Sequence, residues 1–337
     1  MTIGRDIPGL NLRRLVDLMS AAVERCRLDL SSYVVFTEAA SQAYVVTPIL
    51  AAMAGAKQVY ATTRSTRHGT FDEVAANTRH IAKLAGVGNT IEILDGKPRQ
   101  AIAAADIVTN SGHVRPIDAE MISWMKRGAV IPLMYETWEL RETDIDIAAC
   151  RKHGIRLTGT NERHPAVDVF SYLGVMAVKL LHDAAVAVYQ SRILVICDND
   201  FGPFIERGLG SAGAAVDRVT QLQQARPDAP YDAILVSRTP TAEPALSLQD
   251  IAFIAKHWPG TPLVVYWGDV SRQALRDANL SFWPPEAPHA GHMGILPSGV
   301  GPEAIVRLQS GSLKAAEALL RHPDDPQHPD RAFSQPL

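Results

Sequence analysis

Strand-like apolar runs alternate with amphipathic helical patterns along almost the whole chain, and this alternation restricts the fold more than any other feature. Six strand-like runs come first, at 33–36, 58–62, 91–94, 106–109, 129–134 and 155–158. A largely apolar helical pattern over 166–189 follows, and strand-like runs return at 192–196, 216–220, 233–236 and 263–267. Strands that alternate with helices form parallel sheets with crossover helices. The sequence predicts an α/β protein with two Rossmann-like βαβ lobes, joined by a long connector helix.

The length of 337 residues fits two domains of ordinary size. We expect a Rossmann-like domain over 1–185 as the cofactor lobe and a second Rossmann-like or flavodoxin-like domain over 186–322. Repeated prolines after residue 322 predict a frayed tail over 323–337. The Pro/Gly-rich stretch 282–301 contains no predicted regular element.

Composition and charge exclude several classes of protein. The net charge of −3 argues against a nucleic-acid partner, which favours a basic surplus. No apolar run approaches the roughly 20 residues of a membrane span, and the N-terminal stretch has no signal-peptide core. The three cysteines, Cys26, Cys150 and Cys197, have no metal-ligand spacing. We therefore expect a cytoplasmic protein without a metal site that binds a small molecule, and we expect a homodimer.

Small and polar residues follow the first two strands, where parallel sheets bind phosphate groups near helix N-termini. The turn after the first strand has the position of a phosphate loop but lacks the glycines of G-x-G-x-x-G, so a simple tight turn is the alternative reading. The stretch after the second strand has no carboxylate for ribose hydroxyls, which favours NADP over NAD, although a solvated basic turn would look the same. The predicted cofactor residues in these turns are Thr37, Glu38, Ala39, Ala40, Ser41, Thr63, Arg64, Ser65 and Arg67.

Two later strands also end in polar segments that we expect at the same crevice. The first segment adds the cofactor residues Thr109, Asn110, Ser111 and Gly112, followed by the substrate residues His113 and Arg115. The second has Glu136 as a catalytic candidate, with Tyr135, Glu139 and Arg141 as substrate-binding candidates. Carboxylates and guanidinium groups at a strand's carboxyl end face the ligand crevice. The alternative reading is an exposed Glu–Arg ion pair, which contributes little to stability.

The loop near the C-terminus contains two histidines, His289 and His292, within Pro288–Gly294. Histidine titrates near neutrality and serves as a general acid or base, so both are catalytic candidates. Two surface-loop histidines are the alternative. The turn after the first strand of the second lobe, 197–202, has aspartates at Asp198 and Asp200 that would repel a pyrophosphate, so a dinucleotide fits the first lobe better.

Part of the chain, from about Ala105 to Ala215, resembles the D-2-hydroxyacid dehydrogenases, formate and glycerate dehydrogenases included. The matching segments are Ala105–Val108, Ile117–Ile122, Asp144–Ile155 and the later Pro288-His289-Ala290-Gly291. The segments Val108–Gly112 and Met125–Val130 are also similar to S-adenosylhomocysteine hydrolases. This resemblance implies a two-lobe nicotinamide enzyme in which His289 is the catalytic histidine.

The chain departs from the dehydrogenase pattern at two motifs. The glycine fingerprint is degraded in both lobes, and Trp267-Gly268-Asp269 stands where the family has its catalytic arginine. An arginine that binds a carboxylate with two hydrogen bonds cannot be replaced by these residues. The scaffold is therefore expected to be retained with altered chemistry.

The sequence favours an NAD(P)-dependent oxidoreductase that acts on a small, polar, anionic metabolite in an interdomain cleft. One alternative is a non-redox transferase, for example an S-adenosylmethionine-dependent methyltransferase, because a ligand without a pyrophosphate does not need the missing glycines. A second alternative is a non-catalytic ligand-binding protein that has inherited the fold.

Overall fold

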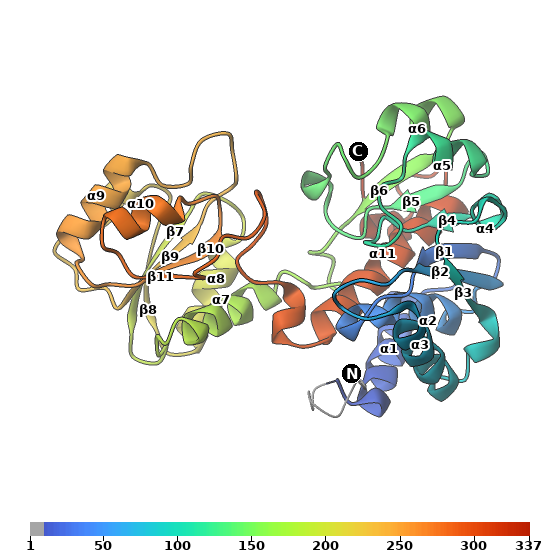
Figure 1. Ribbon diagram of the computed structural model, residues 1–337, viewed down its shortest axis with the longest axis horizontal. Coiled ribbons are helices and arrows are strands. Elements are labelled where there is room, and N and C mark those ends of the chain that lie inside the picture. Colours follow the sequence, from blue (N-terminus) through green and yellow to red (C-terminus); the bar gives the residue numbers. More distant parts are fainter. Residues whose placement is uncertain (1–9) are drawn as a thin grey trace. The chain divides into compact units, whose positions relative to one another are not determined.

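The computed structural model describes residues 10–337, and the chain forms two compact units (Figure 1). The first unit contains the chain up to Val169 together with Gly301–Leu337, and the second contains Phe170–Val300. The chain therefore passes between the units twice, after residues 169 and 300, rather than once near residue 185. The N-terminal nine residues, part of the stretch searched for a signal peptide, lie outside the described region.

The first unit is a seven-stranded sheet with helices on both faces. Its strands are β1 (Val34–Glu38), β2 (Gln58–Thr63), β3 (Ile91–Asp95), β4 (Ile107–Val108), β5 (Val130–Pro132), β6 (Arg156–Thr160) and β12 (Ser334–Gln335). Its α-helices are α1 (Leu12–Cys26), α2 (Val46–Met53), α3 (Phe71–Leu84), α4 (Arg99–Ala104), α5 (Ala119–Trp124), α6 (Ile147–His153) and α11 (Glu303–Arg321). The strand order is β12-β6-β5-β4-β1-β2-β3, parallel except for β12. The order reverses direction between β1 and β4.

Alternating side chains along the strands of the first unit enter two separate cores. Val35, Ile107 and Val130 pack with α1, α2 and α11, whereas the next residue in each strand packs with α4, α5 and α6 on the opposite face. Successive strand residues point to opposite faces of a sheet, so a sheet covered on both sides needs continuous apolar runs. This is why the strand-like runs in the sequence are uninterrupted rather than alternating.

The second unit is a five-stranded parallel sheet in the order β11-β10-β9-β7-β8. Its strands are β7 (Arg192–Cys197), β8 (Ala215–Val219), β9 (Ala233–Ser237), β10 (Leu263–Trp267) and β11 (Phe282–Trp283). Helices α7 (Tyr172–Asp183) and α8 (Gly202–Ser211) cover one face, and α9 (Leu248–His257) and α10 (Arg272–Asp277) cover the other. The two sheets confirm the predicted α/β fold with two Rossmann-like lobes.

Two sequence predictions about elements between residues 166 and 301 are wrong. The helix expected over 166–189 is the shorter α7, which belongs wholly to the second unit and therefore does not connect the units. The left-handed backbone of Asp168 (φ 49°) and Ala185 (φ 59°) is incompatible with helix on either side of α7. The stretch 282–301 also contains β11 and the 3₁₀ turn η6 (Pro297–Val300).

The C-terminal tail is ordered, contrary to the prediction of fraying over 323–337. Its 3₁₀ turn η7 (Pro329–Phe333) places the buried Phe333 in the core of the first unit. The strand β12 then pairs antiparallel with β6, with Ser334 opposite Thr160 and Gln335 opposite Gly159. The prolines of this segment shape turns before a docked strand.

Candidate functional site

The carboxyl ends of β1 and β4 lie side by side at the reversal of strand order in the first unit, and they carry a chain of buried hydroxyl groups. Thr37 Oγ1 lies 2.7 Å from Thr109 Oγ1, which lies 2.9 Å from Ser111 Oγ. In open parallel sheets, ligands bind outside the carboxyl ends of the strands at such a reversal. These three predicted residues are therefore adjacent, as the sequence analysis expected.

Glu38, the last residue of β1, is a buried carboxyl group at the same point. Its Oε2 accepts the backbone N–H of His113 at 2.8 Å. Gly112 lies so close that a Cβ there would be 3.2 Å from this oxygen. Burial raises the pKa of Glu38, while the His113 N–H and the charge of Arg115 oppose that rise.

The turn after β1 leaves little room for side chains. Ala39 and Ala40 are buried, and the Ala39 N–H donates to the Thr62 carbonyl at 2.8 Å. Ser41 makes no side-chain cap for the 3₁₀ turn η2 (Gln42–Val45), and Gln42 has a left-handed backbone with φ 55°. This conformation is unusual for a non-glycine residue and marks a tightly bent strand-to-helix turn.

The ends of β2 and β3 form the basic half of this edge. Arg64 is exposed, and its charge acts on Lys97 and His113, whose pKa values are lowered chiefly by burial. Two predicted residues here have local roles, because Ser65 Oγ accepts the Phe71 N–H and Arg67 bonds to His68. Thr63, the last residue of β2, is buried and its Oγ1 has no hydrogen-bond partner among the described residues.

The ends of β5 and β6 form the acidic half, where three carboxyl groups lie together. Glu136 and Glu162 are buried, and Glu139 belongs to the 3₁₀ turn η4 (Thr137–Glu139). Burial raises the pKa of Glu139 to about 7, and the charge of Glu136 adds to the rise. Burial followed by the charges of Glu139 and Glu136 holds the pKa of Glu162 well above its usual range. We call these three residues the carboxyl triad.

Tyr135, which follows β5, links the end of β4 to Asp144 through hydrogen bonds. Its hydroxyl accepts from Asn110 Nδ2 at 2.6 Å and donates to Asp144 Oδ2 at 2.8 Å, which also pairs with Arg115 at 3.2 Å. Asn110 Oδ1 is buried with no hydrogen-bond partner in the described part of the chain. Buried polar atoms are normally paired, so this oxygen and Thr63 Oγ1 are two atoms at this edge that could bond to a ligand or water.

The predicted catalytic histidines lie in the second unit, on the loop beside the carboxyl end of β10. Gly291, between them, accepts from Trp267 Nε1 at 3.0 Å and donates its N–H to Asp269 Oδ1 at 3.1 Å. The rings of His289 and His292 meet edge to face at 5.7 Å. The loop is thus fixed to the sheet at Gly291.

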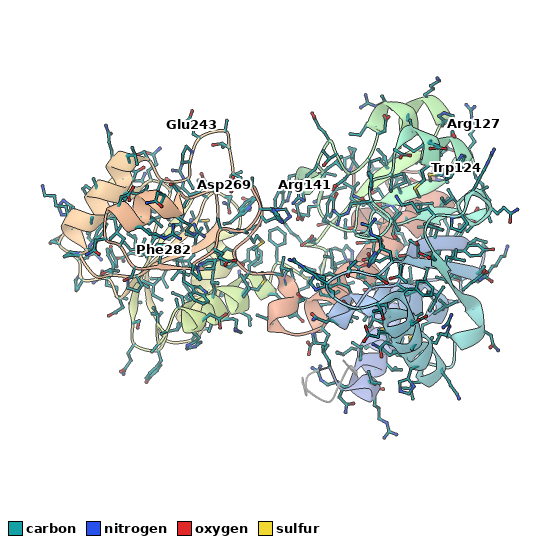
Figure 2. The ribbon with its side chains drawn as sticks, in the orientation of Figure 1. Trp124, Arg127, Arg141, Glu243, Asp269 and Phe282 are labelled. Carbon is teal, nitrogen blue, oxygen red and sulfur yellow. The ribbon has the colours of Figure 1, made fainter. Side chains whose placement is uncertain are left out.

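A cavity of about 350 Å³ lies beside this loop. Glu243 and Asp269 line it from the connections after β9 and β10 (Figure 2), together with Pro288 and Ala290 on either side of His289. Small-molecule sites have volumes of roughly 300–1,000 Å³. The cavity therefore has the size of a small-metabolite site.

The reversal point of the second sheet, between β7 and β9, is bridged by the chain's own side chains. Asp198 pairs with Arg238 at 3.2 Å and accepts the Thr239 N–H at 2.8 Å. Asn199 Nδ2 donates to the Ser237 carbonyl at 2.9 Å. These contacts join the two strand ends at the reversal point of this sheet.

Comparison with known proteins adds to this geometry. No protein-family model matches the sequence, and no curated protein matches it. Solved structures do match. A dipicolinate synthase chain from Bacillus subtilis is similar with a TM-score of 0.58 at 10% identity, over 88% of this chain and 100% of that one.

Two further structures agree. The corresponding dipicolinate synthase chain from Bacillus halodurans gives a TM-score of 0.54 at 12% identity, over 88% of this chain and 100% of that one. The pyruvate reductase of Chlamydomonas reinhardtii gives 0.51 at 13% identity, over 87% and 97% of the two chains. The fold is that of these enzymes. This agrees with the two-lobe fold implied by the dehydrogenase resemblance.

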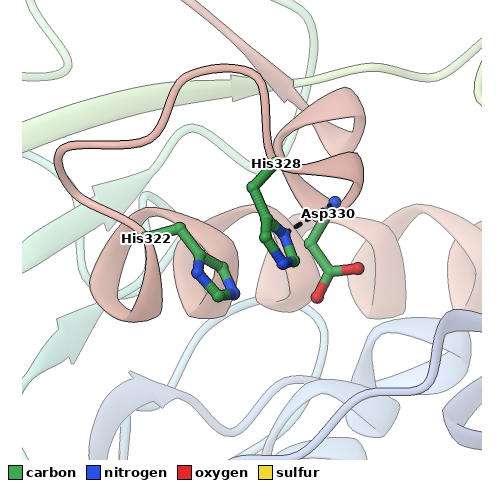
Figure 3. Close-up of side chains that lie close together, drawn as sticks. All are labelled: His322, His328 and Asp330. Atoms are coloured by element: carbon green, nitrogen blue, oxygen red, sulfur yellow. Dashed lines mark hydrogen bonds between the residues drawn. The ribbon is translucent and has the colours of Figure 1, made fainter.

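One group of possible metal ligands occurs among residues 10–337, formed by His322, His328 and Asp330 (Figure 3). The imidazole rings stack at 3.4 Å, and His328 Nδ1 accepts the Asp330 N–H at 3.2 Å. Asp330 also pairs with the buried Lys314 at 2.9 Å. A neutral His328 with Nδ1 as acceptor carries its proton on Nε2, so this group stabilises the tail rather than offering convergent lone pairs.

The structure brings most of the predicted residues of the first unit to one edge, and it adds residues that no sequence pattern marks. Arg141, one of the predicted residues, lies close enough to Glu139 to lower its proton affinity. Glu162 lies in a segment whose sequence suits a helix cap, but its carboxyl group belongs to the triad. Lys97 follows an exposed strand end, which carries no signal of a site. Among residues 10–337, none of the helices combines the length and the apolar surface that a membrane span requires.

Proposed function

We propose that the chain is an NAD(P)-dependent oxidoreductase that holds its dinucleotide at the carboxyl edge of the first sheet. The observation that carries this proposal is the order β3-β2-β1-β4-β5-β6, with its reversal between β1 and β4. This is the order of dinucleotide-binding Rossmann sheets. The structural likeness to enzymes supports the fold, and the edge residues support the ligand.

The two unpaired buried atoms fit such a ligand. Thr63 Oγ1, at the end of β2, lies where the adenosine ribose binds in this fold, and Asn110 Oδ1, at the end of β4, suits the carboxamide of the nicotinamide half. Arg64 and Lys97 form the basic corner suited to a 2′-phosphate, because charged donors bind phosphate more strongly than neutral ones. We therefore retain NADP as the preferred cofactor.

The bound nicotinamide would supply hydride transfer to or from a small, polar, anionic metabolite. The carboxyl triad lies on the half of the sheet where the nicotinamide would bind, and each of its groups favours the cationic, oxidised ring when it is ionised. Arg115 and Arg141 are candidates for binding the metabolite's anionic group. His289 and His292, beside the cavity of the second unit, remain candidates for the general acid or base. We also retain the homodimer and the cytoplasm as expectations.

Glu38 favours a second candidate function. A carboxyl group at the end of β1 disfavours a pyrophosphate when ionised, and it would suit a ligand with an ammonium or sulfonium group. S-adenosylmethionine carries both, so a non-redox transferase is the alternative. When protonated, however, Glu38 can donate a hydrogen bond to a phosphate oxygen, so its raised pKa is compatible with the dinucleotide.

Isothermal titration calorimetry with NADPH, NADH and S-adenosylmethionine distinguishes these functions. We expect NADPH to bind most tightly. Arg64→Gln should lower the affinity for NADPH by about tenfold, because one charge-assisted contact contributes roughly 1.5 kcal/mol. NADH affinity should not change in that variant. Heat with S-adenosylmethionine alone would support the transferase, and absence of heat with either dinucleotide would contradict the oxidoreductase.

A further inference from the structure

The C-terminal strand β12 reaches the carboxyl triad through one side chain, Gln335. Its Nε2 donates to Glu136 Oε1 at 2.9 Å, and its Oε1 accepts the backbone N–H of Thr137 at 3.0 Å. The strand itself is held by pairing with β6, where Gln335 lies opposite Gly159. The side chain thus binds both the carboxyl group and the first residue of η4.

Close packing keeps Gln335 in this position. A Cβ on Gly159 would lie 2.5 Å from Thr137 Cγ2 and 3.3 Å from Gln335 Cβ, so only glycine allows β12 and η4 to approach β6 so closely. Ser334 adds a hydrogen bond to the Ala315 carbonyl of α11 at 3.3 Å. The backbone of Gln335 is therefore held in place by the strand pairing and by the packing against Gly159.

The groups around Glu136 include a hydrogen-bond donor, a cation and two carboxyl groups, and Gln335 adds a neutral amide. Trp138 Nε1 donates to Glu136 Oε2 at 2.7 Å, and Arg163 Nε lies 4.0 Å from Oε1. The carboxyl groups of Glu139 in η4 and Glu162 after β6 interact with Glu136, and the charges of Arg141 and Arg115 oppose the rise in the pKa of Glu139. A neutral amide can orient Glu136 without neutralising its charge, which a lysine or arginine would do.

We propose that Gln335 is a positioning residue, and that the C-terminal strand completes the candidate site by fixing the Glu136 carboxyl group within the carboxyl triad. The contact holds Glu136 in one rotamer, with one oxygen on Gln335 and the other on Trp138. The charge of Glu136 then acts on its two neighbours from a fixed point. The role of this arrangement in catalysis rests on the proposed function. The contacts that fix Glu136 are independent of that function.

Trp138 provides a readout that needs no substrate, because its indole touches Glu136 directly. We would measure tryptophan fluorescence of the full-length protein from pH 5 to 9, with Trp138→Phe identifying the part of the signal that belongs to Trp138. We expect one transition near neutrality in the wild-type protein. Gln335→Glu keeps the acceptor for Thr137 but places a fourth carboxyl group against Glu136, so the midpoint should rise by about one pH unit.

Gln335→Ala, which loses both contacts, should broaden or abolish the transition. Leu337→Ala, at an exposed position two residues further on, should leave it unchanged. Circular dichroism melting shows whether each variant is folded. A folded Gln335→Glu protein with the wild-type midpoint would overturn the proposal. NADPH calorimetry on the same proteins is a separate test. An unshifted midpoint in Gln335→Glu refutes the positioning role, whereas failure of the wild-type protein to bind NADPH refutes the proposed function.

Discussion

Single residues at the carboxyl edge of the first sheet carry the functional argument, and the sequence located several of them. Glu38, Asn110 and Glu136 each directly follow or end an apolar run, and strand ends in a parallel sheet meet at one edge. Their burial was not predictable, because a carboxyl group at a strand end is normally solvated. The role of Glu162 was not predictable either, because its partners Glu136 and Glu139 come from another strand end.

Glu139 gives a prediction for stability as a function of pH. An acid whose pKa is about 7 in the folded protein, against 4.5 normally, binds more protons when folded. The part of the stability that Glu139 contributes should therefore fall as the pH rises from about 5 to 7 and stay low above that range. Glu139→Gln should reduce this slope, leaving the part that comes from Glu38 and Glu162, and should stabilise the protein at pH 8 by on the order of 1–2 kcal/mol.

Urea unfolding at pH 5, 6, 7 and 8 measures this effect. Glu142→Gln, which changes an exposed carboxyl group in the same segment, is the control and should retain the wild-type profile. The same slope in Glu139→Gln as in the wild type would show that Glu139 does not take up the proton.

At the scale of elements, local sequence patterns predicted strands that have a pattern of their own. They failed for elements that form only through contacts with residues distant in the sequence. The predicted strands 233–236 and 263–267 agree with β9 (Ala233–Ser237) and β10 (Leu263–Trp267) because each has its own pattern and clear ends. The strand β12 has two residues and exists only because β6 offers an edge. No periodicity in the sequence could reveal it.

Gly159 tests the docking of β12. We expect Gly159→Ala to lower the free energy of unfolding by about 1–3 kcal/mol, because the new methyl group overlaps Thr137 Cγ2. The double variant Gly159→Ala with Thr137→Ser should recover part of the loss. Gly210→Ala in α8, where a Cβ meets nothing within 4 Å, should be neutral or stabilising by up to about 1 kcal/mol.

Chemical denaturation of these variants under one condition gives the comparison. A Gly159→Ala protein as stable as Gly210→Ala would mean that β12 does not pack as closely as the structure shows.

At the scale of the whole molecule, the alternation of strands and helices predicted two parallel-sheet lobes, and the structure confirms them. The division of the chain was less predictable. Helix α11 packs on α1 and α2, which come from the other end of the sequence, so the first unit is closed by its two termini. Amphipathic patterns show that a helix has a buried face but not which partner covers it.

The central claim is that the carboxyl edge of the first sheet binds a nicotinamide dinucleotide. Hydrogen–deuterium exchange with and without NADPH tests it most directly, because it locates binding along the chain without a known substrate. We predict slower exchange in segments 37–43, 63–67 and 109–113. Protection confined to segment 197–202 of the second unit, or no protection anywhere at saturating NADPH, would contradict the account.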